Sequence, residues 1–153
     1  MKKEYKELYE DVLDEVEAIE ETIERLREIR SKFEPQAKDF CIEPAMGTYL
    51  MNFYNGIENI LKRISKEYYQ TMPKGESWHK ELLGLSCRPP QGKKAIFNQS
   101  IVEKLHQYRN FRHRFVSGYG FELKGEKMLE LIDNIGPLWE DIKRAIADFW
   151  DRF

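Results

Sequence analysis

The chain has 153 residues, the usual size of one domain, and its 41% hydrophobic content is enough for a buried core. The formal net charge is only −2, so the molecule as a whole does not attract a polyanion such as nucleic acid. A polyanion would have to bind a local basic region. The segment 104–114 is such a region, because it holds four Lys or Arg residues, two His and no carboxylate, whereas 4–24 is strongly acidic.

A long first helix is predicted over residues 3–33, where apolar residues recur in alternating steps of 3 and 4. Glu34-Pro35 ends it, because the residue before a proline disfavours helical backbone. The narrow apolar stripe fits either packing inside a bundle or pairing with a second chain. It consists of Tyr9, Val12, Val16, Ile19, Ile23 and Leu26.

A second amphipathic helix is predicted to open at Pro44, a residue suited to a first helical turn. Asn52, Asn55 and Glu58 border its apolar face, and Glu58 is a candidate partner for a buried arginine. The face consists of Met46, Tyr49, Leu50, Phe53, Ile57, Ile60, Leu61 and Ile64.

A turn over 71–75 then leads to a short helix predicted from about Ser77 to Leu85. It carries His79, and a lone histidine on a short helix is typical of a surface or packing role. The following loop, 87–94, is irregular and basic. It suits either contact with a polyanion or plain solvation.

Two further helices complete the chain. One is capped near Asn98 or Ser100 and runs to about Val116, after which Gly118 and Gly120 bend the chain. The last runs over 125–152, and we expect its Gly136-Pro137 pair to kink or interrupt it. No strand pattern is present. The prediction is an all-α, up-and-down bundle of four main helices plus a short one, forming a single domain over 1–153.

Several chemistries lack their sequence signatures. There is no glycine-rich phosphate loop, no HExxH and no pair of cysteines at metal spacing, so we expect no cofactor and no metal. Cys41 and Cys87 are expected to be ordinary reduced thiols. No apolar run approaches the ~20 residues that cross a bilayer, and no secretory signal opens the chain. We therefore expect a cytoplasmic protein that does not enter a membrane.

An arginine lies within the apolar face of the fourth predicted helix. At about 100° per residue, Arg112 falls in the middle of that face, with Arg109, His113 and His106 on its flank. Burying an unpaired arginine costs several kcal/mol, so Arg112 must reach solvent, a structural ion pair, or an anion in a cleft. The apolar face consists of Ile101, Leu105, Tyr108, Phe115 and Tyr119.

The residues around Arg112 suit phosphate chemistry. Arginine binds phosphate with two parallel hydrogen bonds, histidine transfers protons near neutral pH, and tyrosine donates to phosphate or stacks on a base. These groups suit metal-independent RNA cleavage, in which the ribose 2′-hydroxyl is the nucleophile. The candidate catalytic residues are Arg112, His113, Ser117 and Tyr119, and the candidate RNA-binding residues are Arg109, Arg112 and Arg114.

These residues also resemble a known family. The pattern Arg112-x4-Ser117-x-Tyr119 is similar to the Arg-x4-His-x-Tyr motif of HEPN-domain ribonucleases, in particular the HepT-like toxins. The stretches 52–58, 73–83, 111–113 and 119–123 add to the match, which spans roughly Met46 to Phe153. The short motif is weakly specific, and the Pro-x-Gly-x-x-Trp-His stretch of 73–79 at its distance strengthens it.

The resemblance implies a homodimer of helical bundles in which two copies of the motif form one cleft. It implies an RNase toxin of a type II toxin–antitoxin system, neutralised by a small nucleotidyltransferase antitoxin. That antitoxin can adenylylate the motif tyrosine, here Tyr119, while Arg112 would bind phosphate. The motif histidine is Ser117 in this chain, and serine cannot transfer protons as imidazole does. Three alternatives remain: an RNA endonuclease still active through Arg112, His113 and Tyr119, an inactive dimeric module that binds the nucleotidyltransferase or RNA, or a helical structural protein whose basic helix is solvated.

Overall fold

The computed structural model describes residues 3–34, 41–118 and 125–153, and within these ranges it contains helices and no strand. The all-α prediction is confirmed. A 3-10 turn, η1 (Lys3–Tyr5), precedes the first helix, and a π-helical turn, η2 (Ser65–Tyr69), extends the second. The α-helices are α1 (Lys6–Ser31), α2 (Ile42–Ile64), α3 (Trp78–Leu85), α4 (Gln99–Ser117) and α5 (Gly125–Asp151).

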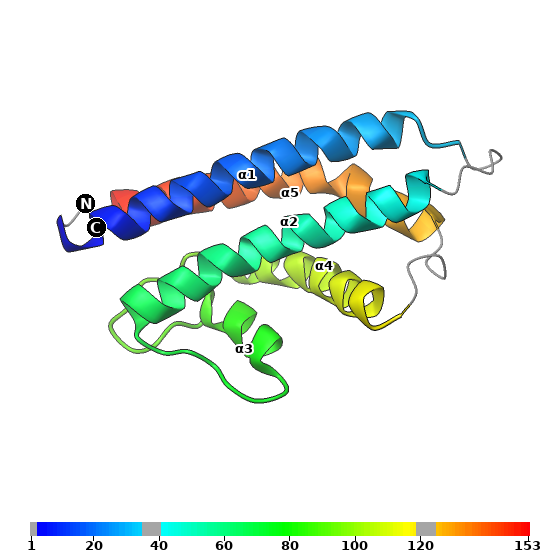
Figure 1. Cartoon of the computed structure of the whole chain (residues 1–153). Helices are drawn as coiled ribbons and strands as arrows, with labels where there is room; N and C mark the ends of the chain where they lie inside the picture. The colour runs from blue at the N-terminus through cyan, green and yellow to red at the C-terminus, as the bar shows by residue number, and fades with distance from the viewer. Residues whose placement is uncertain (1–2, 35–40, 119–124) are drawn as a thin grey trace.

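The four long helices form an up-and-down bundle, as Figure 1 shows. Helix α1 runs away from the end that holds both termini, α2 returns, α4 runs out again and α5 comes back. Both α1 and α4 contact α2 and α5, which closes a ring of four long helices, and α2 also contacts α5 across it. The short helix α3 lies outside this ring, against α2 and α4.

The predicted stripe of α1 packs inside the bundle. Val12, Ile19, Ile23 and Leu26 are at most 2% exposed, and the remaining two stripe residues pack at the margin of the core. Helix α2 comes close to this stripe at Gly56, where an added Cβ would lie 2.5 Å from Cγ1 of Ile19. The absence of a side chain at Gly56 therefore allows the two helices to approach.

The boundaries of α4 and α5 follow largely from local signals. The side chain of Asn98 caps α4, as predicted, by accepting a hydrogen bond from the backbone N–H of Ile101 at 2.8 Å. Helix α5 begins at Gly125 and continues through Pro137, so the predicted interruption there is wrong. An interior proline costs about 3 kcal/mol. Burial of the neighbouring Leu138 and Trp139 offsets this cost, at about 1.5–3 kcal/mol for each large side chain.

The loop predicted over 87–94 holds its lysines against aromatic rings. Nζ of Lys93 lies 4.7 Å from the ring centre of Tyr68, and Nζ of Lys94 lies 5.1 Å from that of Phe153. The backbone N–H of Lys94 also donates to the Tyr68 hydroxyl at 3.0 Å. The basic character of this loop thus serves to attach it to the bundle.

Among the described residues, no helix combines the length and the apolar character needed to cross a membrane.

Candidate functional site

Arg112 lies on the side of α4 that faces α2, where it is half-buried as the helical wheel predicts. Its Nε donates a hydrogen bond to Oδ1 of Asn55 on α2, at 2.5 Å. The partner is a neutral amide, so the bond orients the guanidinium without neutralising its charge. Within the described ranges, its two terminal nitrogens have no acceptor. Those nitrogens form the fork with which arginine binds phosphate.

Arg109 lies one turn before Arg112 on α4 and also bonds to a neutral group. Its Nε donates to Nδ1 of His106 at 3.2 Å, and a terminal nitrogen donates to Oδ1 of Asn110 at 3.1 Å. Burial lowers the pKa of His106, and the charge of Arg109 lowers it further. His106 is therefore held in the neutral form that accepts this hydrogen bond.

A buried carboxylate lies one turn along α2 from Asn55. Glu58 is 2% exposed, and its Oε2 lies 2.6 Å from Nδ1 of His79 on α3. The prediction that Glu58 pairs with a buried arginine is therefore wrong at this contact. The ring of His79 stacks on that of Trp78, with centroids 3.5 Å apart, and Nζ of Lys62 lies 5.0 Å from the Trp78 ring centre.

The hydroxyl of Tyr54 is buried beside these groups. It is one of two buried side-chain polar atoms that lack a hydrogen-bond partner in the described part of the chain. Burial raises the pKa of Tyr54 far above its usual range, the Glu58 carboxylate raises it further, and Arg109 and Arg112 act in the opposite direction. Tyr54 therefore stays protonated. Its hydroxyl also lies close enough to Glu58, Arg109 and Arg112 for their charges to act on it.

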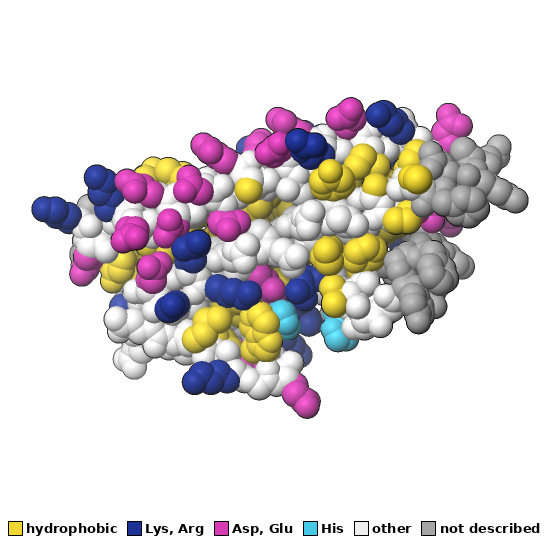
Figure 2. Space-filling model, viewed as in Figure 1, with side chains coloured by type: hydrophobic (Ala, Val, Ile, Leu, Met, Phe, Trp, Pro, Cys, Tyr) yellow, Lys and Arg dark blue, Asp and Glu magenta, His cyan; other side chains and the backbone are white. Residues whose placement is uncertain are grey.

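These contacts define one group of residues, which we call the basic cluster. It draws on α2, α3 and α4, and its cations outnumber its single carboxylate. Figure 2 shows basic and histidine side chains gathered around a hollow over α3 and α4, on the face of the molecule seen in Figure 1. Such a surface suits an anion. The members of the cluster are Tyr54, Asn55, Glu58, His79, His106, Arg109 and Arg112.

The structure separates the candidate residues of the motif. His113 and Ser117 are exposed on α4, where Ser117 is the last residue of the helix. Arg114 is exposed and, with Lys127, lines a hollow of about 270 Å³ between α4 and α5, so it does not join Arg109 and Arg112. Tyr119 lies outside the described residues.

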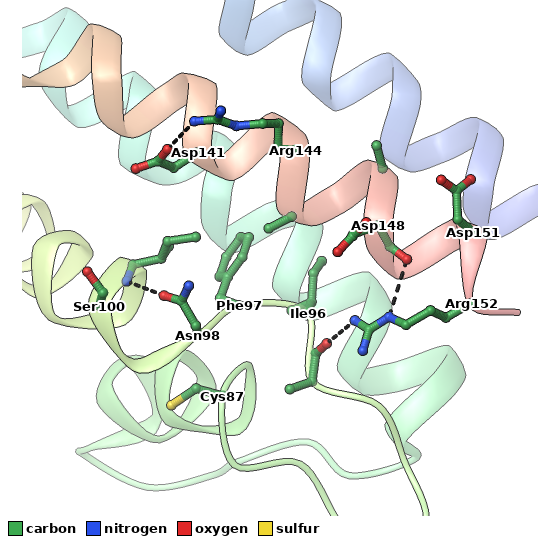
Figure 3. A pocket seen from close by; sticks show the side chains of 14 residues that line it. Cys87, Ile96, Phe97, Asn98, Ser100, Asp141, Arg144, Asp148, Asp151 and Arg152 are labelled. Atoms are coloured by element: carbon green, nitrogen blue, oxygen red, sulfur yellow. Dashed lines mark hydrogen bonds and ion pairs between the residues drawn. The ribbon is translucent and has the colours of Figure 1, made fainter.

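A larger surface hollow, of about 850 Å³, lies elsewhere in the fold (Figure 3). It is formed by α5, the start of α4 and the loop before it, and it shares no residue with the basic cluster. Both of its arginines bond within the fold, and the carboxylates of Asp141, Asp148 and Asp151 also line it, so it does not favour an anion. Arg144 bonds to Asp141 at 2.5 Å, and Arg152 donates to the carbonyl oxygens of Ala95 and Asp148. We therefore place the candidate site at the basic cluster.

The sequence analysis missed one member of this cluster, Tyr54, and misread another, Glu58. Tyr54 lies among the apolar residues of α2, and no local signal sets it apart. Asn55 and Glu58 stood out as polar residues bordering an apolar face, which is a usable signal. The pairing of Glu58 with His79 joins residues 21 positions apart through the placement of α3, and no local pattern encodes it.

The model of a family described as HepT-like protein matches residues 45–153, which covers well over half of the chain and includes the whole basic cluster. No curated protein and no solved structure matches the chain. The described part of the chain forms the all-α, up-and-down bundle expected of a HEPN-type protein. The chain therefore belongs to the HepT-like family.

Proposed function

We propose that the chain is a HepT-like toxin of a type II toxin–antitoxin system, with a metal-independent RNA endonuclease fold that binds RNA at the basic cluster. The observation that carries this proposal is the placement of Arg112. It is half-buried, its Nε is held by the neutral Asn55, and within the described ranges its terminal nitrogens have no acceptor. An RNA phosphate fits that fork.

The charges nearby support the same reading. A structural arginine in a helical bundle normally meets a carboxylate, as Arg30 meets Asp133 at 3.1 Å in this chain. Arg109 and Arg112 instead meet an imidazole and an amide, so both keep their full charge for an external anion. The phosphate backbone of RNA supplies such anions at regular spacing.

The remaining parts of the proposal rest on family membership. We infer that the whole range 1–153 forms one HepT-like domain, because α1 packs along α2 and α5, both of which lie within the matched range. The protein acts in the cytoplasm as a homodimer in which two copies of the motif form one cleft, and its partner is a nucleotidyltransferase antitoxin. Tyr119, two residues after the end of α4, is the candidate for adenylylation by that partner.

A second candidate function follows from Ser117. Its hydroxyl is exposed at the end of α4, where the family motif places an imidazole, and a serine there cannot transfer protons near neutral pH. The alternative is a catalytically inactive dimeric module that binds RNA or the nucleotidyltransferase without cleaving RNA. Under this alternative, Arg109, Arg112 and Arg114 serve binding alone.

The test combines binding with cleavage. Purified protein is incubated with single-stranded RNA in EDTA, and both affinity and cleavage are measured at low and moderate salt. We expect RNA binding that weakens steeply with salt, as phosphate contacts require. A failure to bind RNA would contradict the proposal. Cleavage by the unaltered chain supports the endonuclease, whereas cleavage gained only in Ser117→His supports the inactive module on an intact scaffold.

A further inference from the structure

One turn of α2 holds both a guanidinium and an imidazole. Asn55 accepts from Nε of Arg112 at 2.5 Å, and Glu58 contacts Nδ1 of His79 at 2.6 Å. Side chains three residues apart on a helix are neighbours, with Cβ atoms about 5–6 Å apart. Arg112 from α4 and His79 from α3 are thus brought to adjacent positions by two residues of the same helix turn.

The environment of Glu58 indicates more than a surface ion pair. Its side chain is 3% exposed, and within the described ranges its one ion-pair partner is His79, whose side chain is 30% exposed. Burying a carboxylate with a single partner costs several kcal/mol. A carboxylate on one ring nitrogen fixes the orientation and tautomer of a histidine and leaves the other nitrogen available. In this arrangement the available nitrogen is Nε2 of His79.

The other two histidines of the chain are held differently. His106 uses Nδ1 to accept from Arg109, and burial favours its neutral form. His113 is exposed on α4, and in the described part of the chain it has no hydrogen-bond partner. Only His79 combines a carboxylate partner, partial exposure and a place beside Arg112.

We propose that His79, oriented by Glu58, is the proton-transfer residue of this site and takes the role that the family motif gives to a histidine at position 117. The proposal rests on the proposed function, and it makes Glu58 a positioning residue. It also explains how the site keeps an imidazole although the motif position is Ser117.

The 2′-hydroxyl of RNA gives its proton to Nε2 of His79 while its oxygen forms a bond to the adjacent phosphorus, whose charge Arg112 stabilises. The bond from phosphorus to the 5′-oxygen breaks, and that oxygen takes a proton from water. The hydroxide so formed removes the proton from His79. The products are a 2′,3′-cyclic phosphate end and a 5′-hydroxyl end.

The experiment separates chemistry from binding. An RNA oligonucleotide, and its counterpart with 2′-deoxyribose throughout, are mixed with excess protein in EDTA. The single-turnover cleavage rate, the RNA dissociation constant and the melting temperature are measured for the unaltered chain and its variants. His79→Asn keeps a donor near the position of Nδ1 for Glu58 but removes Nε2. Glu58→Gln keeps an acceptor but removes the charge, and Glu67→Gln, at an exposed position, is its matched control.

General acid–base groups contribute about 10²–10⁴-fold, so we expect His79→Asn to slow cleavage at least about 100-fold. Its RNA affinity should stay within about twofold, because the phosphate contacts are untouched. Glu58→Gln should slow cleavage less than His79→Asn does, and Glu67→Gln should cleave at the rate of the unaltered chain. The oligonucleotide with 2′-deoxyribose should stay intact. If His79→Asn unfolds, the loss of rate in folded Glu58→Gln with unchanged affinity supports the proposal, and an unchanged rate overturns it.

Other outcomes overturn the inference separately from the proposed function. Cleavage by His79→Asn at the rate of the unaltered chain, or a loss confined to His113→Asn, removes His79 from the chemistry while RNA cleavage itself stands. RNA binding without any cleavage by the unaltered chain also overturns the role of His79 and favours the inactive module. An absence of RNA binding overturns the proposed function as well.

Discussion

The two sides of α2 perform different tasks with adjacent residues. On the side facing α1, Gly56 lies against Ile19 with no room for a methyl group, and Arg63 meets the carboxylate of Asp11 at 3.0 Å. On the side facing α3 and α4, Asn55 and Glu58 hold Arg112 and His79. The first side is closely packed and its charges cancel, whereas the second leaves arginine charge unpaired. Close packing with cancelled charge favours stability, and unpaired charge favours binding.

The largest effect expected on RNA affinity comes from Arg112→Ala. A well-placed contact with nucleic acid contributes about 1–3 kcal/mol, so RNA affinity should fall roughly 10- to 100-fold. Arg63→Ala is the matched control, because Arg63 is an arginine whose charge a carboxylate already balances. Fluorescence anisotropy with labelled RNA measures both variants. Equal losses in the two would show that RNA responds only to overall charge and would end the distinction between the two sides.

On the packed side, Gly56→Ala tests the close approach of α1 and α2. The added methyl would lie 2.5 Å from Cγ1 of Ile19, and overpacking of this kind costs about 1–3 kcal/mol, which outweighs the helix propensity of alanine. Urea denaturation measures the change in the free energy of unfolding.

Gly84→Ala in α3 is the control for Gly56→Ala, because it makes the same substitution in a helix where the added methyl has room. Its added Cβ would lie 3.5 Å from the nearest atom, Nη2 of Arg88, an ordinary contact. This substitution should stabilise the protein by up to about 1 kcal/mol, since alanine favours a helix over glycine. A stable Gly56→Ala variant would show that the α1–α2 interface is looser than described.

A smaller effect is expected for the ion pair between Arg63 and Asp11. Both side chains are more than a third exposed, and such pairs contribute about 0.2–1 kcal/mol. A double-mutant cycle with Arg63→Ala and Asp11→Ala should therefore give a coupling energy within this range, decreasing at high salt. A larger coupling energy that does not depend on salt would show that charge stabilises the α1-facing side of α2 more than packing does.

The smallest effect concerns pH and His106. Burial and the charge of Arg109 lower its pKa below the ordinary value of 6.5, so the unfolded chain binds this proton more readily than the folded chain. The contribution to stability is complete above the ordinary pKa and is lost as pH falls through the lower, folded value. His106→Asn keeps an acceptor for Arg109 but does not titrate. Its free energy of unfolding should vary less between about pH 7 and pH 5 than that of the unaltered chain. If the free energies of unfolding of the two proteins change equally with pH, His106 does not contribute to the pH dependence of stability.

Sequence patterns predicted the helices well because the period of apolar residues and the caps are local properties. The stripe from Val12 to Leu26 and the Asn98 cap were both found where the sequence placed them. Of the two outcomes expected at Pro137, a kink or an interruption, the interruption is wrong, because burial of the neighbouring residues outweighs the local preference for a break in α5.

The candidate site was only partly predictable. The sequence alone placed Arg112 on the inner side of its helix and Arg109 beside His106, because both follow from helical spacing within one segment. Only the tertiary structure decided that Arg112 meets Asn55, 57 residues away, and that Glu58 meets His79 on a different helix. Contacts of this kind depend on how helices cross, and the crossing is set by packing across the whole core. Local periodicity therefore determines which residues face inward, and tertiary packing determines which of them meet.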